Sequence, residues 1–94
     1  KNCFMKYKIS KNIAFSKLDG EVCLFHSSTS EYLIINKVGT FIWDLLKEEI
    51  SFNEIVENLV RKYDVDKEDS INALKKFLNK GIKLGIIQEI DIYD

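Results

Sequence analysis

The chain has 94 residues and no proline, a length that fits one compact domain over residues 1–94 with a single hydrophobic core. Hydrophobic residues make up 46% and charged residues 31%, which excludes the low-hydrophobicity composition of a disordered chain. The formal net charge of -1 argues against a nucleic-acid-binding domain, because such domains normally carry a clear basic excess.

The first part of the chain is predicted to form strands. The three predicted strands are residues 13–18, 21–28 and 31–36. Asp19-Gly20 separates the first two and is a strong hairpin signal, because both central residues of a type I′ turn need a positive φ. A Ser/Thr-rich turn precedes the last strand. The sequence therefore predicts an antiparallel meander with segment 21–28 in the middle.

The hairpin turn also decides which side chains share a face of the sheet. With Leu18 opposite Glu21, four apolar side chains lie on one face, which we expect to cover the core. These are Ile13, Phe15, Val22 and Leu24. The last strand, Glu31 to Asn36, has one side of its backbone unpaired unless another segment covers it.

Two helices are predicted directly after the sheet. Asn36 fits the N-cap of the first, whose apolar side chains recur at helical spacing. This stripe comprises Val38, Phe41, Ile42, Leu45 and Leu46. Trp43 points about 100° away from the stripe, and we assign it to the rim of the core rather than to a partner contact. Ser51 and Glu54 form a capping box that starts the second helix, which ends near Asp64.

The third helix is predicted from Asp66, its N-cap, to about Leu84, with Gly85 as the left-handed residue at its end. One apolar stripe suits a core face and comprises Ile71, Leu74, Leu78 and Ile82. A second stripe lies well around the cylinder and comprises Ala73, Phe77 and Leu84. This second stripe needs a different partner. The tail, residues 86–93, alternates apolar and polar residues and is expected to add a short strand or to fray.

This order of elements fits an α+β fold of winged helix-turn-helix type, in which a three-stranded antiparallel sheet is followed by three helices. The sequence contains no run of about 18 apolar residues and no signal-peptide pattern. We therefore expect a cytoplasmic protein that does not contact a membrane.

No catalytic, cofactor or metal site is predicted. His26 is the only histidine, and its place in the middle strand predicts a partly buried, hydrogen-bonded side chain. The glycines are isolated, so the sequence contains no phosphate-binding loop. Cys3 and Cys23 lack the spacing of a zinc site or a redox pair, and a disulfide between them stays open. We expect a protein that is not an enzyme and takes no cofactor and no metal.

Three stretches of the sequence, in this order, match the motifs of a known family: IINKVGTFIWDLL, SFNEIVENLV and FLNKGIKLGII. Together they resemble the PqqD-like family, also known as RiPP recognition elements. The residues that match its motifs are Ile35, Asn36, Gly39, Ile42, Trp43, Ser51, Glu54, Ile55, Phe77, Leu78, Gly85 and Ile86. The hairpin IAFSKLDGEVCLF matches the family's opening strands, so the resemblance covers about residues 9–88. The chain departs from the family at Ala73, often an acidic residue, and at Gly81, often a leucine.

The resemblance implies a domain that binds the leader segment of a ribosomally made precursor peptide and presents it to a modifying enzyme such as a leader peptidase, a cyclase or a radical enzyme. It implies that the leader adds as a strand to the third strand and lies against the third helix. The unpaired strand edge and the second apolar stripe are the two walls that such a groove requires. The candidate peptide-binding residues are Glu31, Tyr32, Leu33, Ile34, Ile35, Ala73, Lys76, Phe77 and Lys80.

Two other functions use the same kind of fold. A DNA-binding winged helix would need a basic recognition helix, whereas Glu54 and Glu57 offset Arg61 and Lys62 in the second helix. A protein-interaction or dimerisation domain would use the same strand edge to pair with itself in a homodimer. We expect no nucleic-acid partner.

Overall fold

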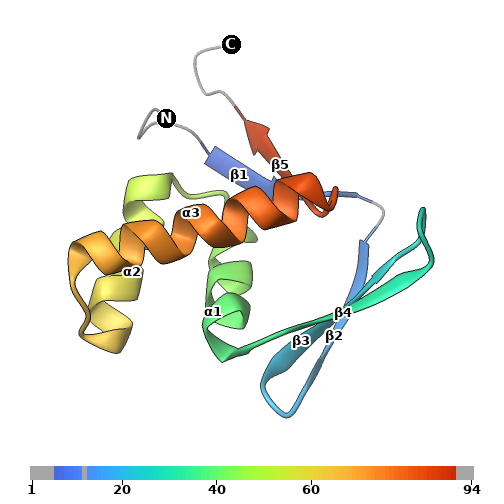
Figure 1. The fold of residues 1–94 in the computed structure, drawn as a ribbon, viewed down its shortest axis with the longest axis horizontal. Coiled ribbons are helices and arrows are strands. Elements are labelled where there is room, and N and C mark those ends of the chain that lie inside the picture. Colours follow the sequence, from blue (N-terminus) through green and yellow to red (C-terminus); the bar gives the residue numbers. More distant parts are fainter. Residues whose placement is uncertain (1–5, 12, 91–94) are drawn as a thin grey trace.

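The computed structural model describes residues 6–11 and 13–90 (Figure 1). The elements are β1 (Lys6–Ile9), β2 (Ile13–Leu18), β3 (Glu21–His26), β4 (Glu31–Ile35), α1 (Lys37–Leu46), α2 (Phe52–Tyr63), α3 (Lys67–Lys83) and β5 (Ile87–Ile90). A three-stranded antiparallel sheet followed by three helices confirms the predicted α+β winged helix-turn-helix arrangement. Figure 1 shows the sheet extending away from the helices.

The chain ends add a second, two-stranded sheet. β1 and β5 pair antiparallel, with Lys6 opposite Ile90 and Ile9 opposite Ile87. No strand was predicted at residues 6–9, and residues 86–93 were predicted to form a short strand or to fray. Residues 91–93 of that tail lie outside the described residues. Tyr7 and Ile87 are buried, so this strand pair belongs to the core.

The hairpin between β2 and β3 turns at Asp19-Gly20 as predicted, with φ of 54° and 81°. Leu18 pairs with Glu21 beside the turn, which confirms the predicted register. The strand order is β2-β3-β4, so β4 is an edge strand of this sheet. β3 ends two residues earlier than predicted, because the Ser30 N–H donates to the His26 carbonyl at 2.7 Å and closes the turn.

The inner face of the sheet packs on the helices through β3. Val22 and Leu24 are 0% and 2% exposed, which confirms that the predicted face of the sheet covers the core at its middle strand. Phe15 on β2 shares this face but remains 44% exposed, because β2 lies at the outer edge of the sheet. Its ring meets the indole of Trp43 edge-on, with centroids 5.5 Å apart. Phe15, not Trp43, therefore lies at the rim of the core.

The buried face of α1 is rotated from the predicted stripe. Trp43 is fully buried, and its predicted rim position is wrong. Val38, the first residue of the predicted stripe, is 40% exposed. The reason is that α1 contacts the sheet on one side and α2 on another, so that two sides of its cylinder are covered instead of one.

The ends of α2 and α3 follow local sequence signals. Ser51 Oγ accepts from the Glu54 N–H at 3.2 Å, and the Glu54 carboxylate accepts from the Ser51 N–H at 2.9 Å, which confirms the capping box. The hydrogen bond from the Ser51 backbone lowers the pKa of the Glu54 carboxyl. Gly85 ends α3 with φ of 79° as predicted. Asp66 occupies the N-cap position of α3, but its side chain makes no capping hydrogen bond, so that part of the prediction is wrong.

The turn from β4 into α1 joins the sheet to the helices. Asn36 leaves the sheet to cap α1 as predicted, and its Oδ1 accepts from the Gly39 N–H at 2.8 Å. The Thr40 hydroxyl accepts from the Val22 N–H at 2.9 Å and donates to the Ile35 carbonyl at 3.3 Å. Both bonds are buried. Thr40 therefore links β3 and β4 at the end where the chain enters α1.

Gly39 should tolerate no side chain. A Cβ atom there would clash with Cγ2 of Ile35 and lie 3.0 Å from Cε1 of Phe77, so β4 and α3 would both have to move. We expect Gly39→Ala to lower the free energy of unfolding by about 1–2 kcal/mol, because overpacking outweighs the gain in helix propensity. Urea denaturation measures the change, and Val38→Ala at the exposed neighbouring position should change it by less than about 1 kcal/mol. An unchanged stability of Gly39→Ala would contradict the close contact.

Candidate functional site

A groove lies between β4 and the C-terminal part of α3. Its first pocket is lined by Leu33, Ile34, Ile35, Asn36, Phe77, Lys80, Gly81, Leu84 and Ile86. Its second pocket lies toward the β3–β4 turn and is lined by Leu24, His26, Glu31, Tyr32, Leu33, Lys80, Leu84 and Ile86. The two pockets share Leu33, Lys80, Leu84 and Ile86, so they form one continuous surface. We call this surface the β4–α3 groove.

The groove brings together seven of the nine candidate residues from the sequence. These are Glu31, Tyr32, Leu33, Ile34, Ile35, Phe77 and Lys80. Ala73 and Lys76 line neither pocket and are exposed. They lie on α3 one helical turn before Phe77 and Lys80, so they extend the same helix face beyond the pockets.

Several lining residues were missed by the sequence analysis. Leu84 belongs to the second apolar stripe of α3, a signal that was available, and is 41% exposed. Gly81 lines the groove from α3, one helical turn after Phe77. Ile86 lines it because the chain turns back at Gly85, and no periodicity indicates that return. A Cβ atom on Gly81 would clash with the side chain of Ile87, so α3 packs directly on β5 behind the groove.

The free edge of β4 offers backbone groups of alternate residues. Thr40 Oγ1 bridges the Val22 N–H and the Ile35 carbonyl, so the backbone of Ile35 points toward β3. Successive residues of a strand direct their N–H and C=O groups to opposite sides. The backbone groups of Tyr32 and Ile34 therefore point to the free edge, where an added strand would pair with them.

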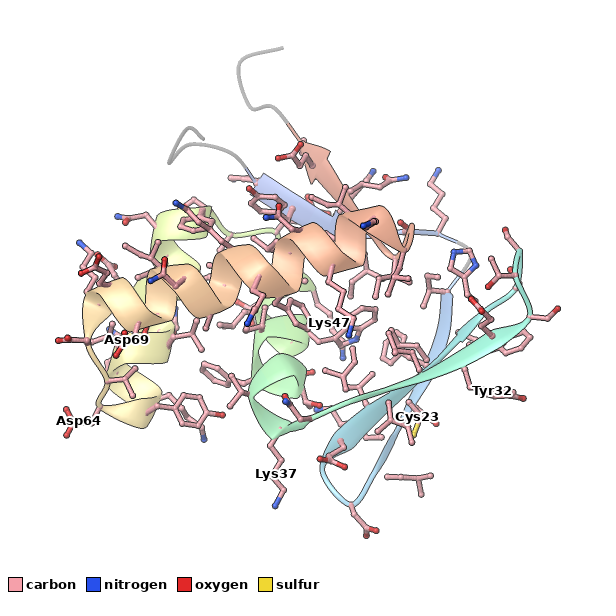
Figure 2. All side chains as sticks on the ribbon, viewed as in Figure 1. Cys23, Tyr32, Lys37, Lys47, Asp64 and Asp69 are labelled. Carbon is pink, nitrogen blue, oxygen red and sulfur yellow. The ribbon has the colours of Figure 1, made fainter. Side chains whose placement is uncertain are left out.

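The side chains of β4 divide between two faces. Ile35 is buried and Leu33 is half-buried on the inner face, toward α3. Tyr32 and Ile34 lie on the outer face and are 80% and 69% exposed. Figure 2 shows the Tyr32 side chain directed away from the helices. Tyr32 and Ile34 thus offer the groove mainly their backbone, whereas Leu33 offers its side chain.

The sequence of the chain matches the family described as coenzyme PQQ synthesis protein D (PqqD) over residues 21–87. The chain belongs to the PqqD family. The matched segment runs from β3 to the start of β5 and includes both walls of the groove. A comparison with curated protein sequences finds no significant match.

Two solved structures resemble this PqqD-family domain closely. TbiB1 in complex with the TbiA(beta) leader peptide is 32% identical, with a TM-score of 0.82 over 86% of this chain and 94% of that chain. Lasso peptide synthetase B1 complexed with the leader peptide is 17% identical, with a TM-score of 0.80 over 87% of this chain and 96% of that chain. At this lower identity, the second likeness shows the fold alone.

An ion pair ties the sheet of the PqqD-family domain to α1. Lys17 Nζ lies 2.7 Å and Lys47 Nζ 3.4 Å from the carboxylate oxygens of Asp44, and Lys47 Nζ also lies 4.8 Å from the ring centroid of Phe15. Burial raises the pKa of Asp44, but the hydrogen bonds and charges of Lys17 and Lys47 lower it by more, so it lies below its ordinary value. The Asp44 carboxylate is charged at neutral pH and contacts Lys17 of β2, and a partly exposed pair of this kind contributes about 1 kcal/mol or less.

His26 and Cys23, two side chains of β3, carry groups that can take part in chemistry. His26 is half-buried as predicted, but its Nδ1 has no hydrogen-bond partner among the described residues, contrary to the prediction. Cys23 is half-buried, and Cys3, its candidate disulfide partner, lies outside the described residues.

Residues 6–11 and 13–90 contain no cluster of His, Cys, Asp or Glu that could hold a metal ion. No helix in this part of the chain is long and apolar enough to span a membrane.

Proposed function

We propose that this PqqD-family domain binds the leader segment of a ribosomally made precursor peptide and presents it to separate modifying enzymes. The observation that carries the proposal is the β4–α3 groove, in which a strand edge with free backbone groups faces an apolar helix surface. Membership of the PqqD family and the likeness to TbiB1, whose structure contains a leader peptide, support the same function.

The physical mode is β-strand addition, in which backbone hydrogen bonds supply general attraction and side-chain pockets supply selectivity. Tyr32 and Ile34 each offer one N–H and one C=O, so about four hydrogen bonds of about 1 kcal/mol each are expected. A micromolar complex needs about 8 kcal/mol after the costs of ordering the peptide. Apolar leader side chains must contribute the remainder against Leu33, Phe77 and Leu84, at about 1.5–3 kcal/mol for each fully buried side chain.

The proposed binding surface keeps all the residues expected from the sequence and gains Leu84 and Ile86. Ala73 and Lys76 would contact a leader that continues along α3 beyond the pockets. Lys76 and Lys80 would attract acidic leader residues, at under about 1 kcal/mol each, because both ammonium groups are exposed to solvent.

The domain would bind the leader without changing it, since a binding groove with no reactive constellation needs an enzyme partner for chemistry. That partner would be a leader peptidase, a cyclase or a radical enzyme. We expect the domain to act in the cytoplasm, where precursor peptides are made.

Calorimetric titration tests whether the domain binds leaders. The probes are the TbiA(beta) leader and the leader of any short precursor peptide encoded near this chain, and at least one should bind in a one-to-one complex. Random duplex DNA at low salt is the negative control. Mass spectrometry after incubation should show an unchanged peptide. The proposal fails if neither leader binds, or if the pure domain changes the peptide covalently.

The contribution of the strand edge is tested by two substitutions at one position. Ile34→Pro removes the outward N–H without removing a bond between β3 and β4, and should weaken leader binding by about tenfold or more. Ile34→Ala keeps the N–H and should weaken binding by less than about threefold, because the side chain points outward. Calorimetry gives both affinities, and circular dichroism checks the fold. Equal affinities for the two variants would show that the leader does not pair with this edge.

The extension along α3 is tested at Ala73. Because Ala73 is exposed, Ala73→Arg should leave the fold intact while placing a long charged side chain in the leader's path, with a loss of about fivefold or more in affinity. Asn72→Arg adds the same charge at the neighbouring exposed position, about 100° around the helix, and should bind normally. If Ala73→Arg binds as tightly as Asn72→Arg, the leader leaves α3 before this turn.

A further inference from the structure

A polar pocket adjoins the groove between the β3–β4 turn, the β1–β2 connection and the end of α3. Its polar lining comprises Lys8, Ser10, Lys11, His26, Ser28 and Gln88. We call it the polar end pocket. It differs from the apolar groove beside it, because six of its eight lining residues carry hydrogen-bonding side chains, and only Ile13 and Gly85 do not.

The charges of the polar end pocket have one sign. Lys8 is half-buried and Lys11 is exposed, and no carboxylate belongs to the lining among the described residues. Glu31 pairs with His26 across β3 and β4 but lines the second pocket of the groove instead. Two ammonium groups with hydroxyl and imidazole neighbours are the chemistry that binds a carboxylate through charge-assisted hydrogen bonds.

The polar end pocket is continuous with the β4–α3 groove. His26 lines both the second pocket of the groove and the polar end pocket. Leu84 lines the groove and Gly85, the next residue, lines the polar end pocket. A Cβ atom on Gly85 would lie 3.3 Å from Nε2 of His26, so glycine leaves the imidazole and the passage beside it uncrowded. A peptide that runs along β4 past Glu31 would thus arrive at Lys8 and Lys11.

We propose that the polar end pocket is a further binding site, which takes the carboxylate of an Asp or Glu side chain on the bound leader. Lys8 and Lys11 would donate to the carboxylate, with the hydroxyls of Ser10 and Ser28 in support. The site would fix the register of the leader, because backbone pairing on an edge strand permits a shift of two residues and a single charged anchor does not. This inference rests on the proposed function.

A charge-coupling experiment tests the site with the leader that binds in the titrations above. Each Asp and Glu of that peptide is replaced in turn by Asn or Gln, and affinities are measured for the parent and for the double variant Lys8→Gln, Lys11→Gln. We expect one replacement to weaken binding to the parent by about three- to tenfold and to have no effect in the double variant. The control variant Lys75→Gln, Lys83→Gln removes two exposed α3 lysines outside the pockets and should behave like the parent.

Two outcomes overturn the inference without touching the proposed function. In the first, the leader binds, but every acid replacement has the same effect in the parent and the double variant. In the second, sodium acetate binds saturably, as NMR shifts at His26 and Lys11 would show, while no leader acid shows coupling. That result would identify the pocket as a site for free anions. Thermal melting of Lys11→Gln alone, at an exposed position, checks that a loss of binding is not a loss of fold. Failure of the parent to bind any leader would instead reject the proposed function, and this inference with it.

Discussion

The buried hydroxyl of Thr40, in the first turn of α1, joins β3 to β4, the strand that forms one wall of the groove. It accepts from β3 and donates to β4 while its own helix packs in the core, so the edge strand cannot shift without breaking buried hydrogen bonds. A buried polar group left without its partner costs about 1–3 kcal/mol. One residue earlier, Gly39 allows Ile35 and Phe77 to approach over the first turn of α1. Ile35 and Phe77 also line the groove, so their close approach at Gly39 sets how near the strand edge and α3 lie to each other.

Signals within a few residues were sufficient to predict much of the fold. The Asp19-Gly20 turn, the Ser51–Glu54 capping box and the end of α3 at Gly85 are each decided by local backbone geometry. The β1–β5 pair was missed because its strands lie at opposite ends of the chain, with no turn between them to indicate pairing. The burial of Trp43 was misjudged because periodicity in one helix reports one covered face and cannot show that a second helix covers another.

Two parts of the candidate site were predictable, because each is a surface that the predicted fold leaves without a packing or pairing partner. Among the described residues, β4 pairs with β3 on one side only, and the second apolar stripe of α3 lies outside the core. Both features could be found from the sequence alone. The extent of the groove was not predictable. Figure 1 shows the N-terminal part of α3 over α2 and its C-terminal part beside the sheet, so only the later residues of the stripe line the pockets. That inclination depends on the tertiary contacts of α3 with α2 and β5.

A groove built on an exposed strand edge limits how tightly it can hold a peptide. Water competes for every backbone hydrogen bond at the edge, so each contributes only about 1 kcal/mol net, and an unstructured leader loses conformational entropy when it becomes a strand. Affinity must then come from a few apolar contacts, which do not by themselves define a register. A domain that presents a peptide to an enzyme needs both modest affinity, so that the peptide can leave, and a fixed register, so that the segment to be modified extends from a constant point. Apolar pockets for affinity and a separate polar contact for register satisfy these two requirements independently.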